Sequence, residues 1–171
     1  INQSHEPLLI ESNDQGTGSL LHHNANVSAR VQQHIAGDPG IWRMMAAPVS
    51  DHALTTEFVK GPLYAWFEPS QSWVSSQNQH VWPTWEFIHH SDNFQRVRGY
   101  LIAPDFAQGD NPTLEFSGIL NQGSFDVTLQ RKGNQQDPYY GFNLIGNPYP
   151  SHIDWQSSEW LKNHIDNTLY F

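Results

Sequence analysis

Length, composition and charge describe one folded domain and argue against several classes of protein. The 171 residues suffice for one domain with a hydrophobic core, and 13% aromatic with 15% charged residues favours a β-rich fold over a disordered chain. A net charge of -9 with eight lysines and arginines argues against binding to nucleic acid or anionic membranes, and the absence of cysteine excludes disulfides, zinc–thiolate sites and thiol nucleophiles.

The beginning of the chain has the pattern of short strands separated by tight turns. We expect strands over residues 7–11, 19–22 and 27–32, because β-forming residues there alternate with turns rich in Asn, Asp and Gly. A turn at residues 37–40 then leads into a strand over residues 41–49. Four short strands are therefore expected in this part of the chain.

A short helix and an aromatic hairpin are expected next. Apolar spacing over residues 51–59 permits a helix of one or two turns, which the Gly-Pro pair at residues 61–62 would end. Residues 64–68 and 73–74 have the pattern of two strands joined by a polar loop.

Aromatic residues are concentrated between residues 64 and 87, and two interpretations of this belt are open. Aromatic rings favour pleated, half-buried surfaces, so the belt can fill the core or cover the edge of a β-sandwich. Tryptophans on loops beside amide, carboxylate and imidazole groups can instead form a platform on which pyranosides stack. In that case the candidate ligand-binding residues are Trp66, Trp73, Trp82, Trp85 and Glu86.

Histidines and loop carboxylates do not form a recognisable metal site. The adjacent histidine pairs at residues 22–23 and 89–90 would point to opposite faces of a strand, so we interpret them as surface or loop residues. Loop oxygens at residues 92–93, 105 and 110–111 could hold a structural calcium ion, but they lack the spacing of a calcium-binding loop. We therefore expect ordinary Asx turns there, no metal ligands and no cofactor.

The chain contains no recognisable catalytic motif. A nucleophile elbow, a zinc-protease motif, a phosphate-binding loop and a dinucleotide-binding glycine motif are all absent from the sequence. Carboxylate pairs for glycoside hydrolysis could be drawn from Glu57, Glu68, Glu86 and Glu115, but the sequence sets no distance between them. We therefore predict that the chain is not an enzyme and name no catalytic residue.

The second half has the clearest strand pattern. We expect strands over residues 100–103, 113–117, 125–129 and 140–145, and strict alternation within 125–129 predicts one buried and one solvated face. About ten short strands at regular spacing predict a mainly β fold, an antiparallel, jelly-roll-like β-sandwich with one or two short helices.

A turn rich in Gly, Asn and Pro follows the last of these strands. Gly146 can adopt a positive φ, and the prolines after it prevent the sheet from continuing. Apolar residues beyond the turn, with Ser151 or Asp154 as cap, predict a short helix that packs on the sheet. The residues assigned to this structural turn are Gly146, Asn147, Pro148, Tyr149, Pro150, Asp154 and Trp155.

The segments 42–48 and 142–148 follow the same order of residue types. Each has an aromatic residue, a polar residue, two apolar residues, two small residues and then proline. The two small residues are Ala-Ala in the first segment and Gly-Asn in the second. Two equivalent core strands in opposite halves of a sandwich would explain this match.

The run GFNLIGNPYPSHIDW at residues 141–155 resembles a long motif, G-W-N-L-(I/V/L)-G-N-P-Y-P-S-x-I-D-W, of large secreted and cell-surface proteins of Bacteroidetes-type bacteria. Proteins with this motif are commonly exported by the type IX (Por) secretion system. Further segments resemble the same proteins in the same order, at residues 16–21, 27–35, 42–50, 99–102 and 114–123. The chain departs from the pattern where serines are usual, at residues 42–47, and at His34, where an aromatic residue is common.

The resemblance implies a non-catalytic structural or adhesive module of a secreted, surface-attached bacterial protein. A carbohydrate-binding module that uses exposed tryptophans is the alternative. The expected partners are neighbouring domains of the same polypeptide and, for the alternative, a polysaccharide or surface glycan. We expect a monomer. We also expect no membrane insertion, because no stretch approaches the roughly 20 apolar residues that span a bilayer.

The domain boundaries follow from the same resemblance. We expect residues 1–171 to be one module and a fragment of a longer protein, in which residues 1–35 can dock a preceding repetitive region. Residues 168–171 alternate and are rich in β-forming residues, so we expect a terminal strand whose side chains are held in the sheet or against a neighbouring segment.

Overall fold

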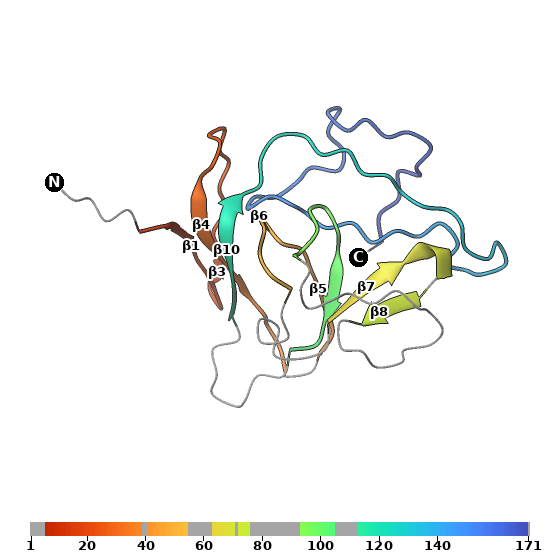
Figure 1. Cartoon of the computed structure of the whole chain (residues 1–171), viewed down its shortest axis with the longest axis horizontal. Coiled ribbons are helices and arrows are strands. Elements are labelled where there is room, and N and C mark those ends of the chain that lie inside the picture. The colour runs from red at the N-terminus through yellow and green to blue at the C-terminus, as the bar shows by residue number, and fades with distance from the viewer. Residues whose placement is uncertain are drawn as a thin grey trace.

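The computed structural model describes residues 6–38, 41–54, 63–70, 72–75, 93–104 and 113–170, and of residues 70 and 72–75 it describes the backbone. The fold is mainly β, as predicted, and resembles a β-sandwich (Figure 1). Two four-stranded sheets have the strand orders β1-β4-β10-β6 and β5-β9-β7-β8, and a two-stranded hairpin, β2-β3, lies beside the first. The described part of the chain has one helical turn, the 3-10 helix η1 at Glu68–Ser70.

The first sheet is built around a long antiparallel pair. Strands β4 (Ser28–His34) and β10 (Thr113–Leu120) pair along seven residues, and the short strand β6 (Val49–Ser50) extends β10 on its far side. Strand β1 (Leu8–Ile10) runs parallel to β4, so the first 35 residues supply one edge strand and one central strand of this sheet. The hairpin consists of β2 (Ser12–Asn13) and β3 (Gly16–Thr17).

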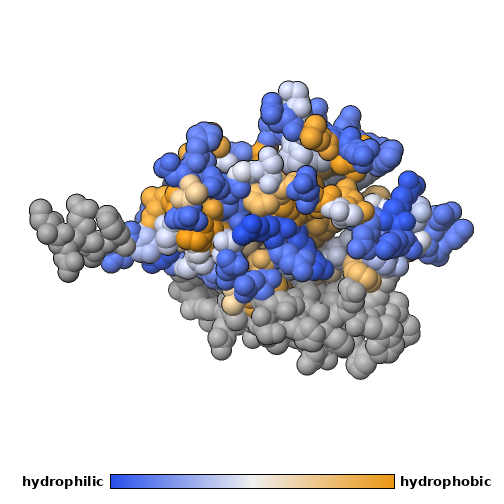
Figure 2. Space-filling view, turned by 45° about the horizontal axis from the view of Figure 1, so that its top comes forward, coloured by the Kyte–Doolittle hydropathy of each residue, from blue (hydrophilic) through white to orange (hydrophobic). Residues whose placement is uncertain are grey.

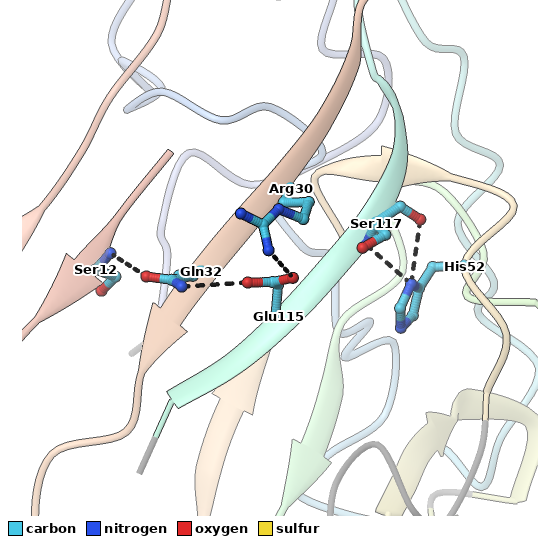
Figure 3. A network of polar contacts seen from close by, with 6 residues as sticks. All are labelled: Ser12, Arg30, Gln32, His52, Glu115 and Ser117. Atoms are coloured by element: carbon cyan, nitrogen blue, oxygen red, sulfur yellow. Dashed lines mark hydrogen bonds and ion pairs between the residues drawn. The ribbon is translucent and has the colours of Figure 1, made fainter. Parts of the chain in front are cut away.

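Polar residues cover the outer face of this sheet. Arg30 and Gln32 on β4 both donate to Glu115 on β10, at 3.4 Å and 3.2 Å (Figure 3). The backbone N–H of Ser12 donates to the side-chain oxygen of Gln32 at 3.4 Å, which continues the row to the hairpin. Buried and solvated residues therefore alternate on these two strands.

The second sheet is antiparallel throughout. Its strands are β5 (Arg43–Met45), β9 (Tyr100–Ile102), β7 (Leu63–Phe67) and β8 (Ser72–Ser75). The predicted hairpin is confirmed as β7-β8, and the strands predicted at residues 100–103 and 113–117 are confirmed as β9 and β10.

Residues of both sheets meet in one hydrophobic core. Leu63, Ala65 and Tyr100 of the second sheet and Val31 and Phe116 of the first are all at most 5% exposed. The remaining buried members are Ile10, Ala29, Met45, Ala47, Val49, Leu54, Phe94, Ile102, Leu114 and Leu120.

The strand predicted at residues 41–49 is two strands that belong to different sheets. Between β5 and β6 the chain crosses from one sheet to the other through Ala46, Ala47 and Pro48. Buried Asn121 holds this crossing, because its side-chain amide donates to the Ala47 carbonyl at 3.2 Å and its backbone N–H donates to the Pro48 carbonyl at 3.0 Å.

The strands predicted at residues 125–129 and 140–145 are wrong. The backbone N–H and carbonyl of Gln130 bind the side-chain amide of Asn143, at 3.0 Å and 2.9 Å, so a side chain replaces the neighbouring strand. In the second segment, the described β pairing is an isolated bridge between Ile145 and Arg98, which lies just before β9. Residues 121–170 otherwise follow an irregular path above the sheets (Figure 1).

Three further predictions of local structure are wrong. Residues 19–22 are not a strand, because the N–H of Leu20 binds Pro150 instead of a sheet neighbour. Residues 151–160 form turns in place of the predicted helix, and residues 168–170 are not a strand. The helix predicted at residues 51–59 falls mostly outside the described residues, and residues 51–54 are not helical. No helix in the described part of the chain has the length and apolar character needed to cross a membrane.

Candidate interaction surface

Gly146 lies where three segments approach closely. A Cβ on this residue would overlap the Cβ of Ala46 and come within 2.8 Å of the Arg98 carbonyl oxygen. The N–H of Gly146 donates to the Val97 carbonyl at 2.8 Å, which fixes the segment beside the start of β9. The predicted positive φ is wrong, since Gly146 is not among the glycines with positive φ. Glycine is required here by close packing between 42–48 and 142–148, not by backbone conformation.

Asn147 closes the turn that the sequence predicts. Its side-chain oxygen accepts from the N–H of Tyr149 at 3.0 Å, and its amide donates to the Ser151 carbonyl at 2.6 Å. Pro148 and Pro150 are buried on either side of Tyr149. The Asx turn and the two prolines together determine the path of this segment.

The same turn joins segments that are distant in the chain. The Tyr149 hydroxyl donates to the Gly123 carbonyl at 2.6 Å, and its ring lies 5.7 Å from that of Phe125. Burial raises the pKa of the Tyr149 hydroxyl. The Pro150 carbonyl accepts from the N–H of Leu20 at 2.8 Å. The turn thus connects the region before β4, the chain after β10 and the second sheet.

Two tryptophans stabilise the irregular segment beyond the turn. The ring centroids of Trp155 and Trp160 are 4.9 Å apart, and their indole N–H groups donate to the carbonyls of Asn167 and Asp154 at 3.0 Å and 2.7 Å. Lys162 lies over the Trp155 ring at 4.2 Å and donates to the Trp155 carbonyl at 2.8 Å. Asp154 accepts from the N–H of residue 156 at 2.8 Å, so it closes a turn rather than capping a helix.

Four aromatic rings form a surface cluster beside β7. Trp66 lies 6.1 Å from Tyr139, Tyr139 lies 5.9 Å from Phe142, and Phe142 stacks on Tyr170 at 5.2 Å, all measured between ring centroids. The indole N–H of Trp66 donates to the Phe142 carbonyl at 2.6 Å. Tyr139, Phe142 and Tyr170 are 54%, 39% and 72% exposed. We call these four residues the aromatic cluster.

Glu68 anchors the loop that carries the cluster. Its carboxylate is 97% buried by the surrounding residues, at 3% exposure. It accepts hydrogen bonds from the backbone N–H groups of Lys132, Gly133 and Gly141 at 2.7, 3.3 and 2.9 Å. Because a carboxylate bonded to several N–H groups is strongly held, Glu68 fixes both ends of the loop that bears Tyr139.

A second exposed apolar group lies on the same sheet. Trp42 and Met44 are 47% and 58% exposed, and the ring of Trp42 lies 5.3 Å from that of Tyr64. Figure 2 shows apolar residues in separate patches among hydrophilic ones on the face that it presents. The outer face of the second sheet and the loop above it therefore present aromatic groups to solvent.

Comparison with known protein families identifies the family of this chain. Residues 12–171 match the family described as domain of unknown function DUF8693. The chain belongs to this family. The matched DUF8693 region includes the turn at Gly146, the aromatic cluster and Glu68.

The DUF8693 domain is also similar to part of a fimbrial protein. It is 26% identical over 171 residues to the minor fimbrium subunit Mfa5 of Porphyromonas gingivalis. That match covers 93% of this chain and 13% of the relative, so the chain spans a small part of that protein's length. No solved structure matches the chain.

Of the five ligand-binding candidates, the structure places two. Trp66 belongs to the aromatic cluster, and the backbone of Trp73 pairs with that of Trp66 across β7 and β8. Trp82, Trp85 and Glu86 lie outside the described residues. The predicted sugar-binding platform therefore stays a prediction.

No metal site is formed within the described ranges, where no three His, Cys, Asp or Glu side chains are grouped closely enough. Nδ1 of His22 lies 3.1 Å from the Asn24 carbonyl, an ordinary turn contact. The pair at residues 89–90 and the loop oxygens at 92, 105 and 110–111 lie outside the described residues, so the calcium alternative is untested.

Among the described histidines, His52 lies in an environment that shifts its pKa. Its ring packs against Phe116 at 5.2 Å and Phe94 at 6.0 Å between centroids. Burial lowers the pKa of His52, although a hydrogen bond from the protonated ring to the Ser117 carbonyl, 3.3 Å from Nδ1, opposes the change. In the neutral ring Nδ1 can instead accept from the Ser117 N–H at 3.1 Å (Figure 3).

Sequence reasoning missed the residues that position the cluster. The sequence presents Glu68 as one of several carboxylates, and it contains no pattern that predicts Tyr139, Phe142 and Tyr170 at the surface. The sequence offers one signal for the position of these side chains. Tyr64, Trp66 and Glu68 are spaced two residues apart, so in a strand they would lie on the same face. Nothing in the sequence connects Glu68 to the N–H groups of a loop more than 60 residues away.

Proposed function

We propose that the chain is a non-catalytic structural module of a surface-attached bacterial protein and that it acts by packing against neighbouring domains or subunits. The observation that carries this proposal is the similarity to a minor fimbrium subunit along 93% of the chain. The match covers only 13% of that relative, whose role is a property of the whole protein. A role of this chain in assembly is therefore our inference.

The use of polar side chains in the structure supports this proposal. Glu68, Asn143 and Asn147 all bind backbone groups of the same chain, as do the indoles of Trp155 and Trp160. These groups hold an irregular polypeptide in one conformation. A rigid surface that keeps its exposed rings in place is suited to packing against another protein.

The test is an in-frame deletion of the module from its parent gene. We expect the deletion to reduce surface display or attachment of the parent protein while leaving hydrolytic activities of the cell unchanged. Normal display and attachment, together with loss of a hydrolytic activity, would overturn the proposal.

Carbohydrate binding is the second candidate, and the exposed rings of the aromatic cluster favour it. Stacked aromatic residues at a surface can bind the apolar faces of pyranosides. An array of plant, algal and microbial polysaccharides probed with the purified domain should give a signal that falls in Tyr170→Ala. A folded domain that gives no signal on the array would exclude this function for the carbohydrates tested.

We also propose that the parent protein is secreted to the cell surface by the type IX system. The motif at residues 141–155 supports this, as the resemblance implies. Immunolabelling of intact cells with and without a functional type IX system tests it. Surface labelling that persists without the system would contradict this route.

A further inference from the structure

Aromatic rings contact several cations of this chain. Of the lysines and arginines that the structure describes, four lie over a described ring within 6 Å of its centroid. The pairs are Arg96 with Phe125, Arg98 with Tyr100, Arg131 with Tyr140 and Lys162 with Trp155, at 5.9, 5.9, 4.8 and 4.2 Å. The electron-rich face of an aromatic ring attracts a cation at such distances.

Three rings of the aromatic cluster have no such cation among the residues that the structure describes. Tyr139, Phe142 and Tyr170 are substantially exposed, yet none of the lysines and arginines in the described ranges lies over them. Arg131, Lys132 and Lys162 are the cations closest in sequence to this region. Arg131 and Lys162 lie over other rings, and the backbone N–H of Lys132 donates to Glu68. Within the described residues, the chain therefore presents aromatic faces of the kind that its own cations contact, with none of these cations over them.

The charge of the chain also favours a positive partner. Along the sequence, the segment 137–170, which contains all three rings, carries four carboxylates and one lysine. The carboxylates are Asp137, Asp154, Glu159 and Asp166. The whole chain has a net charge of -9. An acidic surface attracts a basic partner and repels an acidic one.

The cluster is also held in place before any partner arrives. Glu68 binds Gly141, next to Phe142, and the Trp66 indole binds the Phe142 carbonyl. The side chain of Asp137 accepts from the N–H of Tyr139 at 2.8 Å. Because these bonds fix the backbone that bears two of the rings, little conformational freedom is lost on binding.

We propose that Tyr139, Phe142 and Tyr170 form a docking surface for lysine or arginine side chains on a basic segment of a neighbouring protein subunit or domain. This proposal rests on the proposed function, since it names the chemistry of the partner against which the module packs. Cation–π contacts give the specificity, and the net negative charge of the chain attracts the basic segment over a longer range.

The test uses the purified chain and three peptides of equal length. Acetylated, amidated peptides of alternating Arg-Gly, Gln-Gly and Glu-Gly repeats are titrated by calorimetry at low and high salt. We expect binding of the arginine peptide only, with affinity that falls as salt is added. Equal binding of the glutamine peptide, or no binding of the arginine peptide at millimolar concentration, would overturn the proposal.

A double variant separates the aromatic faces from apolar bulk. Tyr139→Leu with Tyr170→Leu keeps apolar side chains but removes two rings, so we expect binding to weaken by about fivefold to thirtyfold. The matched control is Trp42→Leu, which removes an exposed ring outside the cluster and should leave the affinity unchanged. Unchanged affinity in the double variant would overturn the proposal. Circular dichroism shows whether each variant is folded, and the peptide comparison on the unaltered chain does not depend on the variants.

Two other outcomes distinguish this proposal from its alternatives. Binding of an oligosaccharide, lost in the double variant while the arginine peptide does not bind, would assign the cluster to a sugar instead. If the arginine peptide does not bind, the docking surface is excluded, but the proposed structural function can still hold because the module can pack through other contacts. If the deletion does not reduce display or attachment, the proposed structural function is excluded whatever the peptides show.

Discussion

At the scale of single residues, the fold depends on a few positions where a side chain or its absence determines the path of the chain. Gly146 allows the segments 42–48 and 142–148 to touch, and Asn121 holds the crossing between the sheets. Glu68 binds three N–H groups of one loop.

Replacing Gly146 should destabilise the domain through overpacking. In Gly146→Ala the new Cβ would overlap Ala46 and crowd the Arg98 carbonyl, so we expect unfolding to become easier by about 1–3 kcal/mol. Gly16→Ala is the matched control, because a Cβ there has no neighbour within 4 Å. Thermal melting compares the two. Equal melting temperatures would mean that the segments do not pack as described.

Replacing the Glu68 carboxylate by an amide should loosen the loop it anchors. Glu68→Gln keeps the shape but places an NH₂ group opposite backbone donors, so we expect a loss of about 1–3 kcal/mol. Glu159→Gln, at an exposed carboxylate, should have little effect. Urea unfolding measures both. A Glu68→Gln variant as stable as its control would show that the three N–H groups do not depend on the charge.

His52 should make stability depend on pH. Because the folded-state pKa is lowered, the unfolded chain binds a proton more readily, near the usual pKa of about 6.5. Its contribution to stability is thus fully present above that pH and is lost as pH falls through 6.5 toward the folded pKa. His52→Gln should flatten this dependence, and His23→Gln, at an exposed position, should not. Identical pH profiles for both variants would contradict this account.

At the scale of elements, the sequence predicts strands well where backbone pairs with backbone. The alternation in β4, β10 and the β7-β8 hairpin identifies these strands, because their buried faces follow a period of two. Residues 125–129 alternate just as strictly, yet Gln130 binds the Asn143 side chain and no strand forms. Local pattern cannot reveal that a side chain 13 residues away takes the place of a strand.

Removing that side chain should free the segment around Gln130. Asn143→Ala deletes the acceptor of the Gln130 N–H and the donors to the Gln130 and Gly141 carbonyls. We expect the Gln130 amide to exchange with deuterium faster in the variant, while amides of β10 keep their protection. Unchanged exchange at Gln130 would mean that another group protects it.

The candidate site was less predictable than the sheets. Alternation places Trp66 on the solvent side of β7, but Tyr139, Phe142 and Tyr170 join it from a segment without regular structure. The motif at residues 141–155 predicts the turn correctly. Gly146 is required there because neighbouring segments approach closely, and its φ is not positive. Such contacts depend on the tertiary fold, which periodicity does not describe.

At the scale of the whole molecule, a sandwich-like core supports an irregular layer that presents exposed rings. The turn at residues 146–151 connects this layer to both sheets, and the indoles of Trp155 and Trp160 hold its far end. The net charge of -9 and the exposed cluster then favour a basic protein neighbour. The central claim is that this surface packs against another protein.

Site-specific photo-crosslinking on intact cells tests that claim most directly. A photoreactive phenylalanine analogue replaces Tyr139 in the full parent protein, and a second version carries it at exposed Glu159 as the control. Mass spectrometry of the adducts should identify, for position 139 only, a lysine- or arginine-containing peptide of a neighbouring subunit or domain. Adducts to polysaccharide alone, or the same pattern from both positions, would contradict the account.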